Sequence, residues 1–493
     1  MQSKHSLAEL ESKIHDLSLE LDPKLMREAG YRAMDWIIKR HTDLRGWPLG
    51  RELHRGETEA LLREPMPEEG MDFHHVFDEF TTKVAPNAVH LDHPMFFAFI
   101  PSAPTFVSVL ADTLVAGANV FVGTWYESSG PSQVEIVVID WFKQMLGLPA
   151  AAAGLLVSGG SVATLTSLAV ARHARLNDET ANAVVYLSDQ THTATDRALR
   201  LLGFRTDQVR RIPADSAFRM DTETLRERIR LDIRNGLRPF ALIANAGTTN
   251  TGAIDPMSEM SAIARDFGLW LHVDAAYGGF AALTKRGCRL LAGIENADSV
   301  VLDPHKWFYC GIEAGCAIVR EARAMRDTFK ILPEYMTDVG REEREVNFCD
   351  YGLQLTRAFR ALKVWMTLKS FGARRLREII DQCMDLASFA AALFSQSPRI
   401  EITSAPSLGV FSFRYVPEGL ASSDEEYLNR INADLVARAV ASRQIVLSST
   451  RFGSRLVIRF CVLSHRTRKE DIRDALRLVE RFGQEASAQA PRA

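Results

Sequence analysis

The sequence lacks most of the features that mark secreted, membrane-spanning or metal-binding proteins. No run of apolar residues is long enough to span a bilayer, and the opening MQSKHSLAELE has no apolar signal-peptide core. No two cysteines form a CxxC pair or a zinc-type spacing, which predicts free thiols in a reducing compartment. We therefore expect a cytoplasmic protein with no metal site and no membrane partner.

Net charge is also nearly absent. The 59 lysines and arginines stand against 62 aspartates and glutamates, which leaves no overall field to attract nucleic acid. A hydrophobic fraction of 46% with 25% charged residues is typical of a globular protein. At 493 residues the chain is too long for one ordinary core, so we expect roughly three domains.

The first of these domains is predicted to be a helical segment over residues 1–89. Apolar residues recur at helical spacing through residues 7–45, and residues 57–62 and 73–84 resemble further helices. These helices have no core of their own size, so their apolar faces need a partner. We expect that partner to be a second copy of the chain, which makes the protein a homodimer.

Residues 90–376 are predicted to form a large α/β domain. Helices are expected over residues 162–176, 191–202 and 256–267, the last with Asp255 as its N-cap and Gly268 as its stop. Strands that alternate with helices predict a mostly parallel sheet that binds ligands at the carboxyl ends of its strands. The strands expected in this domain are residues 155–157, 183–187, 240–245, 269–273, 299–302 and 317–319.

Residues 377–493 are predicted to form a smaller α+β domain. It should begin with a helix to about residue 394 and end with a helix over residues 469–482, with another helix from residue 424. The strands expected between them are residues 400–404, 410–415, 445–448 and 456–462.

Lys306 is the first candidate for chemistry. It follows the buried strand 299–302 in the stretch DPHKW, where loss of hydration disfavours the ammonium form, lowers the pKa and frees the amine as a nucleophile. Such an amine can form a Schiff base. The plain alternative is an interfacial lysine with its stem on the core and its charge in water.

Asp274 ends another hydrophobic strand, in the stretch HVDAAYGG, where an acid is often only a helix cap. Together, HVDAAYGG and DPHKW resemble the group II pyridoxal-dependent decarboxylases. The resemblance implies the fold-type I fold of pyridoxal phosphate enzymes, with Lys306 bonded to the cofactor and Asp274 keeping the pyridine nitrogen protonated. It implies decarboxylation of an L-amino acid, with aromatic substrates as the default and acidic or sulfinate substrates left open.

A glycine turn supplies the expected phosphate site. Residues 158–161, SGGS, stand between a strand and a helix, where the backbone can approach an anion and free N–H groups point at it. The resemblance makes Gly160 and Ser161 phosphate ligands. It also implies that His192 stacks on the cofactor ring and contacts the substrate. The remaining cofactor contacts that it implies are Thr249, Ala276 and His305.

Two positions that bear on binding depart from the family pattern. Ser102 matches a substrate-contacting threonine and keeps the hydroxyl group. Asp303 stands where the family has an asparagine that helps to hold the phosphate. Since a carboxylate beside a dianion is repulsive unless it is protonated or turned away, we do not expect Asp303 to be a direct phosphate ligand.

Phe348 is the departure that bears on the product. Counting back from the motif RAFRALKVW, it occupies the place of a loop tyrosine regarded as the acid that protonates Cα after carbon dioxide leaves. Phenylalanine has no proton to give, so a long-lived carbanion can react with oxygen. The alternative product is then an aldehyde with ammonia and peroxide. Tyr351, His192 or water can supply the proton instead, and we expect simple decarboxylation to the amine.

Rival functions remain open at this point. A binding or structural protein on the same fold is one of them, because a fold does not guarantee chemistry. An aminotransferase is another, with Arg459 imagined on the substrate carboxylate, although a structural ion pair is the plainer role of that arginine.

Overall fold

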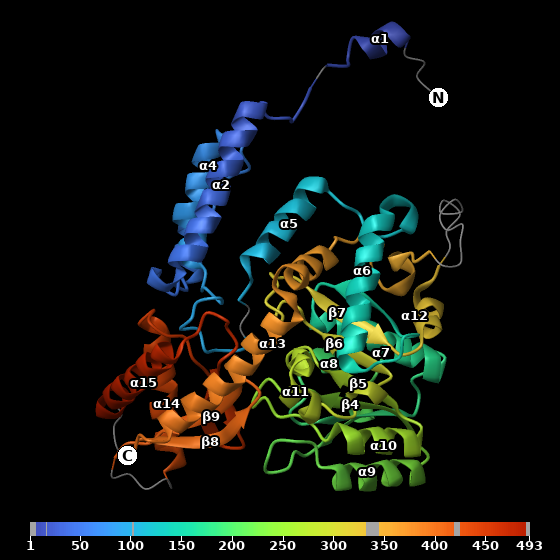
Figure 1. Ribbon diagram of the computed structural model, residues 1–493, viewed down its shortest axis with the longest axis vertical. Coiled ribbons are helices and arrows are strands. Elements are labelled where there is room, and N and C mark those ends of the chain that lie inside the picture. The colour runs from blue at the N-terminus through green and yellow to red at the C-terminus, as the bar shows by residue number, and fades with distance from the viewer. Residues whose placement is uncertain (1–5, 16, 101–102, 332–344, 419–423, 490–493) are drawn as a thin grey trace. The chain divides into compact units, whose positions relative to one another are not determined.

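A computed structural model describes residues 6–15, 17–100, 103–331, 345–418 and 424–489 of the chain. The chain divides into two compact units, Met1–Val89 and His90–Ala493. Figure 1 shows both in the colours of the sequence. None of the helices in the described ranges is long and apolar enough to cross a bilayer.

The first unit is helical, as the apolar spacing predicted. Asp22 caps its longest helix by accepting a hydrogen bond from the Lys24 N–H at 2.8 Å, and Pro23 occupies the first turn. Trp36 packs edge-on against Phe80, with 5.4 Å between ring centroids. Its helices are α1 (Leu7–Glu11), α2 (Pro23–Asp43), α3 (Arg55–Leu62) and α4 (Phe73–Glu79), with the short turns η1 (Leu44–Gly46), η2 (Phe80–Val84) and η3 (Ala85–Asn87).

The second unit contains a seven-stranded sheet in the order β1-β7-β6-β5-β4-β2-β3. All neighbours from β6 to β3 are parallel, and β7 runs antiparallel to both β1 and β6. The mostly parallel sheet is thus confirmed. Its strands are β1 (Ala153–Val157), β2 (Ala183–Ser188), β3 (Val209–Ile212), β4 (Arg238–Asn245), β5 (Trp270–Asp274), β6 (Ser299–Leu302) and β7 (Gly315–Val319).

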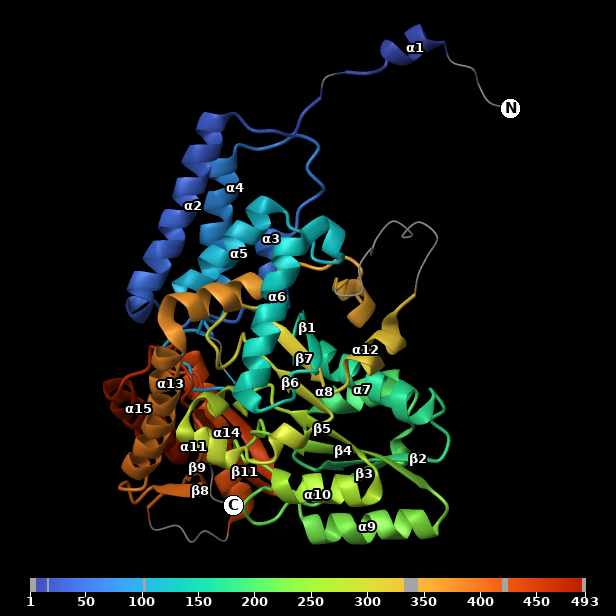
Figure 2. The ribbon, with the colours of Figure 1, turned by 45° about the vertical axis from the view of Figure 1, so that its right-hand side comes forward.

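Helices cover both faces of this sheet. Figures 1 and 2 show α9 (Thr222–Arg234) and α10 (Met257–Phe267) on one side and α7 (Gly160–Leu176) on the other. The other helices before the small sheet are α5 (Phe106–Ala118), α6 (Trp125–Leu146), α8 (Thr193–Leu201), α11 (Lys285–Leu290) and α12 (Ala322–Phe329). Short turns are η4 (Thr206–Gln208), η5 (Gly278–Leu283), η6 (Ile294–Asn296) and η8 (Phe348–Tyr351).

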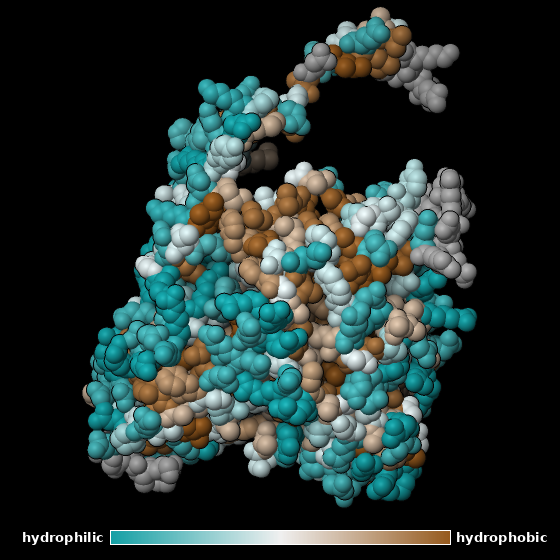
Figure 3. Space-filling view, in the orientation of Figure 1, coloured by the Kyte–Doolittle hydropathy of each residue, from teal (hydrophilic) through white to brown (hydrophobic). Residues whose placement is uncertain are grey.

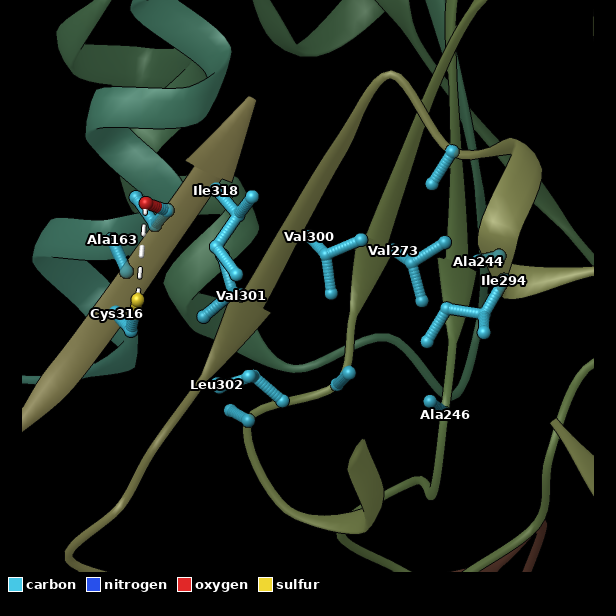
Figure 4. Packing of buried hydrophobic residues seen from close by; sticks show 14 of the residues in the cluster. Ala163, Ala244, Ala246, Val273, Ile294, Val300, Val301, Leu302, Cys316 and Ile318 are labelled. Atoms are coloured by element: carbon cyan, nitrogen blue, oxygen red, sulfur yellow. Dashed lines mark hydrogen bonds between the residues drawn. The ribbon is translucent and has the colours of Figure 1, made fainter. Parts of the chain in front are cut away.

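The core lies between this sheet and its helices. Figure 4 shows Val273, Val300 and Ile318 from three adjacent strands packed side by side, and all three are completely buried. Because both faces of the sheet are covered, its strands read as continuous apolar runs rather than as alternating patterns. Burial of the strands holds their carboxyl ends in fixed positions. The polar candidate residues of the site lie at these ends.

A second, antiparallel sheet has the order β10-β11-β9-β8. Figure 2 shows it beside α14 and α15. Its strands are β8 (Ile400–Ser407), β9 (Val410–Tyr415), β10 (Ser448–Phe452) and β11 (Arg455–Cys461), and its helices are α13 (Ala361–Phe394), α14 (Glu425–Ala441) and α15 (Lys469–Gln489). The predicted boundary at residues 376 and 377 falls inside α13, close to its break at Gly372, and stays a prediction.

Two local predictions were wrong. The strand expected over residues 445–448 begins only at Ser448, because Val446 instead pairs with Phe96 in an isolated parallel bridge. Asp255 does not cap α10, whose N-cap is Pro256. The buried carboxylate of Asp255 instead accepts hydrogen bonds from the backbone N–H of Met220 and of Asn245, both at 2.8 Å.

Candidate active site

A cavity of about 450 Å³ opens at the carboxyl ends of five strands, β1, β2, β4, β5 and β6. Parallel strands bring their ends to one edge of a sheet, so residues far apart in sequence meet there. All eight predicted cofactor contacts line this cavity, namely Gly160, Ser161, His192, Thr249, Asp274, Ala276, His305 and Lys306. Ser102 lies outside the described residues.

Lys306 sits in the turn after β6, and its Nζ lies 2.8 Å from Oδ2 of Asp303. Burial lowers the pKa of Lys306, as expected from the sequence. The charge of Asp303, the hydrogen bond between them and the charge of Asp274 outweigh burial, so the net pKa is raised above its ordinary value. The expectation of a free amine in the cofactor-free protein is therefore wrong, because a carboxylate three residues away holds the ammonium form.

The glycine turn forms the start of α7, with Gly159 as its N-cap. The first N–H groups of a helix have no partner within the helix, and the helix dipole adds positive potential there. A Cβ added to Gly159 or Gly160 would come within 3.3 Å of His305 or 2.8 Å of Asp303, so the turn has no room for larger residues. This end of the cavity suits a small anion such as a phosphate.

Asp274 ends β5 opposite Asn245 of β4. Its Oδ1 accepts a hydrogen bond from the Ala276 N–H at 3.1 Å, and both residues line the cavity. An acceptor in this position can hold a proton on a ring nitrogen.

The two histidines of the cavity are both oriented by backbone donors. His192 Nδ1 accepts from the Ala194 N–H at 3.2 Å, and His305 Nδ1 accepts from the Ala314 N–H at 3.1 Å. Each ring therefore keeps its proton on Nε2. Burial lowers the pKa of His305, which favours this neutral form.

Arg459 of β11 fixes the loop that carries Thr249. The guanidinium donates to the backbone carbonyls of Thr249 and of Asn250, the latter at 3.2 Å, and to that of Phe99 at 3.1 Å. Among the residues that the structure describes, it has no carboxylate partner. The ion pair considered from the sequence is thus not found there, and Arg459 acts on the site through backbone contacts.

Phe348 is not brought to the cavity. Its ring is buried in the core, 4.8 Å from the guanidinium carbon of Arg357, and Tyr351 packs beside it with 6.1 Å between ring centroids. Neither residue is among those that line the cavity. The assignment of Phe348 to the place of the family's proton-donating loop tyrosine therefore stays a prediction.

Sequence reasoning missed several lining residues. Asn245, Thr248 and Tyr277 line the cavity, and the Tyr277 hydroxyl accepts a hydrogen bond from the Gly409 N–H at 2.9 Å. Their positions at the ends of β4 and β5 are a signal that the strand pattern already contained. Ile312 and Glu313 also line it, and no sequence pattern marks them.

The cavity fits pyridoxal phosphate in its donor set. One end offers a helix N-terminus for the phosphate, Lys306 offers an amine for the aldehyde, and Asp274 offers an acceptor for the ring nitrogen. No group of three or more metal-ligating side chains occurs in the described ranges.

Comparisons with known proteins agree with this chemistry. The pyridoxal-dependent decarboxylase conserved domain matches residues 56–416. The chain is 40% identical to an aromatic-L-amino-acid decarboxylase of Bacillus atrophaeus, over 96% of this chain and 98% of that one. It is 29% identical to a phenylacetaldehyde synthase of Arabidopsis thaliana, over 93% and 94% of the two chains.

A solved structure is similar over almost the whole chain. The crystal structure of Oryza sativa TDC with PLP and tryptamine has a TM-score of 0.90 and 28% sequence identity. The match covers 95% of this chain and 99% of that one.

Proposed function

Because the chain belongs to the pyridoxal-dependent decarboxylase family, we propose that it removes the carboxyl group of an aromatic L-amino acid and releases the amine. Decarboxylation of an amino acid with pyridoxal phosphate follows from the family itself. The aromatic side chain is supported by the relative from Bacillus atrophaeus. The assignment rests on the observation that Lys306, Asp274 and the N-terminus of α7 line the same cavity.

Each residue of the cavity has one proposed task. The first turn of α7, with Gly160, Ser161 and the Thr249 loop, binds the phosphate. Lys306 would hold the cofactor through its amine. Asp274 would keep a proton on the ring nitrogen, and Ala276 and His192 would contact the ring. When bound, pyridoxal phosphate supplies the electron sink for the bond that breaks.

His192 is proposed to orient the substrate. Since its Nδ1 accepts the Ala194 N–H, its Nε2–H is the group that can donate to the carboxylate of the amino acid. His305 keeps the same tautomer and lies beside the glycine turn, because a Cβ added to Gly159 would come within 3.3 Å of its ring.

A substrate panel tests the function. Purified enzyme should release carbon dioxide and amine from phenylalanine, tyrosine, tryptophan or dihydroxyphenylalanine. It should not release them from glutamate or cysteine sulfinate. Carbon dioxide from the acidic substrates alone would overturn the aromatic assignment, and a keto acid without carbon dioxide would overturn decarboxylation.

Aldehyde formation is the second candidate, and Phe348 is the observation that favours it. A relative at 29% identity is a phenylacetaldehyde synthase. If this activity is the main one, wild type consumes oxygen and forms aldehyde and peroxide, and Phe348→Tyr restores the amine. Because Phe348 is buried, the melting temperature of the variant should also be compared with that of wild type. Amine as the sole product of wild type, without oxygen uptake, rejects this candidate.

We also propose that the enzyme is a homodimer. An apolar area lies over α5 and α13, shown in brown in Figure 3, where Leu114 and Phe371 are exposed. The helices of residues 1–89 bury few of their own apolar side chains, with Ala29, Leu44 and Leu49 the buried ones among the described residues. A second copy would cover such surfaces.

The cytoplasm is the proposed compartment. All six cysteines are free thiols, which is typical of proteins in a reducing compartment.

A further inference from the structure

Arg459 of β11 is a buried cation without an acid beside it. The residue is 3% exposed, and in the part of the chain that the structure describes its hydrogen bonds go to carbonyl, hydroxyl and thiol groups. Buried arginines are usually paired with an acid, because a charge is costly to remove from water. The acceptors around Arg459 must therefore compensate for the lost water.

These acceptors come from three segments that are far apart in the sequence. The guanidinium binds the carbonyls of Thr249 and Asn250 in the loop after β4. It also binds the carbonyl of Phe99 and, at 3.1 Å, the Ser448 hydroxyl of β10. One nitrogen, Nη2, binds both Phe99 and Thr249. Two oxygens on one nitrogen lie within roughly 6 Å of each other, so the Phe99 backbone lies beside the loop whose Thr249 lines the cavity.

Phe99 has a backbone conformation that an aromatic residue rarely adopts. Its φ is 52°, in the left-handed region. Its N–H donates to Ser448 Oγ at 3.2 Å and its carbonyl accepts from Arg459 at 3.1 Å, so both sides of the residue are fixed. Strain of this kind persists where the surrounding contacts impose it, and it is common at functional segments. Burial of the ring does not offset the strain, because Phe99 is 62% exposed.

We propose that Arg459 is a positioning residue that holds the Phe99 segment against the Thr249 loop, so that both are in place when cofactor and substrate bind. The inference rests on the proposed function, because one of its readouts is the KM for an aromatic amino acid. Without the guanidinium, Phe99 can relax from its left-handed conformation and its segment can move away from the loop. Ligands must then order the two segments as they bind, which weakens binding.

The chemical step should be affected less than binding. Arg459 has no hydrogen bond to Lys306, Asp274 or His192 among the described residues. An interaction that contributes equally to the bound substrate and to the transition state changes KM and leaves kcat nearly unchanged. A positioning role therefore predicts a rise in KM that exceeds the fall in kcat.

Arg459→Lys tests this role. Lysine keeps the positive charge, but its nitrogen is one bond closer to the backbone and ends short of the two carbonyls that Nη2 binds. We expect the KM for the aromatic substrate to rise about tenfold, as for loss of a hydrogen bond to a charged group, with a smaller change in kcat. The dissociation constant for pyridoxal phosphate, measured by visible absorbance without substrate, should rise too, because the Thr249 carbonyl loses its donor.

Arg414→Lys is the matched control. Arg414 is a fully buried arginine of β9 in the same sheet, and it pairs with Glu425 at 3.0 Å, outside the cavity lining. This variant should lower the melting temperature but leave KM and the cofactor constant unchanged. Neither constant depends on how much of the protein is folded, so a merely structural role of Arg459 would not move them. An unchanged KM in Arg459→Lys, or an equal rise in both variants, would overturn the proposal.

Ser448→Ala is a second variant that reaches the same contact from the other side. It removes the hydroxyl group that accepts from both Arg459 and the Phe99 N–H, and it should raise KM in the same direction. In the double variant with Arg459→Lys, KM should rise by less than the product of the two single effects, because both act on the Phe99 segment. Independent effects would overturn the proposal. A wild type that releases no carbon dioxide would instead overturn the proposed function.

Discussion

Neighbouring charges decide how Lys306 titrates, and its burial alone does not. Asp303 at 2.8 Å holds the ammonium form although burial acts in the opposite direction. An ammonium group is not a nucleophile, so Lys306 must give up a proton before its nitrogen can attack an aldehyde.

Covalent attachment at Lys306 is the first prediction. Borohydride treatment of the loaded enzyme should fix the cofactor on the peptide that contains Lys306, because it is the lysine that lines the cavity in the described chain. Peptide mass spectrometry checks this. Lys306→Ala should lose the label and at least about a thousandfold in activity, since a covalent catalyst is removed. Lys369→Ala, outside the cavity lining, should keep both, and label on another lysine would contradict the assignment.

His272 supplies a prediction on pH. It is completely buried in β5, and burial lowers its pKa to about 4, against which the charge of Asp274 acts. The unfolded chain, with an ordinary pKa of about 6.5, binds more protons than the folded chain between these two values. Stability is therefore full above pH 6.5, falls as the pH is lowered, and is reduced by about 3 kcal/mol below pH 4.

Urea unfolding of wild type and His272→Leu across this pH range isolates the effect. Relative to wild type, the loss of stability on acidification should be smaller in His272→Leu by about 3 kcal/mol. The exposed His54 serves as control, and His54→Gln should follow wild type. Identical pH profiles for all three proteins would show that His272 does not titrate in this way.

At the scale of elements, one buried ion pair joins α6, β1 and the segment that leads into α13. Arg357 pairs with Glu135 of α6, and both side chains are essentially unexposed. Glu135 also accepts the Leu156 N–H of β1 at 2.8 Å, and Arg357 donates to the carbonyl of Val122 at 2.8 Å. Because β1 leads directly into the phosphate turn, this pair supports the site from behind.

Removing one partner of this pair should be costly. Glu135→Leu leaves the Arg357 charge buried without its partner, which should lower the free energy of unfolding by about 3–5 kcal/mol. The control is Asp327→Ala, because Arg323 and Asp327 form an exposed pair and their loss should change stability by less than about 1 kcal/mol. Denaturant unfolding at one protein concentration measures both. Comparable losses in the two variants would contradict the special role of the buried pair.

At the scale of the whole molecule, the exposed apolar residues of α5 predict how copies associate. Leu114 is 56% exposed on the half of α5 that also exposes Ala116, Gly117 and Ala118. Leu114→Glu places a charge in the proposed interface, which should disfavour association. We expect a lower mass by light scattering and reduced activity at low protein concentration.

Leu201 is a matched control for this variant. It is 74% exposed at the end of α8, so Leu201→Glu changes the same residue type at a surface outside α5 and α13. It should remain a dimer with unchanged activity. A monomeric wild type, or a Leu114→Glu dimer as stable as wild type, would reject the interface.

The amino-acid sequence by itself determined the strands and the residues at their ends. Apolar runs of three to five residues followed by Gly160, His192, Asp274 or Lys306 were enough to predict a parallel sheet with one site at its edge, because burial of a strand is a local property of its side chains. The short strand β3 and the helix α9 were not predicted, since their many charges hide the apolar pattern.

Tertiary structure alone decided three matters. It set the pKa of Lys306, because that depends on where the Asp303 carboxylate lies in the folded turn. It buried Phe348 under Arg357, away from the cavity lining. It turned Arg459 towards the Thr249 carbonyl, although the two residues lie 210 positions apart. The first outcome depends on the shape of one turn, and the other two depend on contacts between distant segments. Strand periodicity encodes neither, whereas the positions of the strand ends follow from local burial.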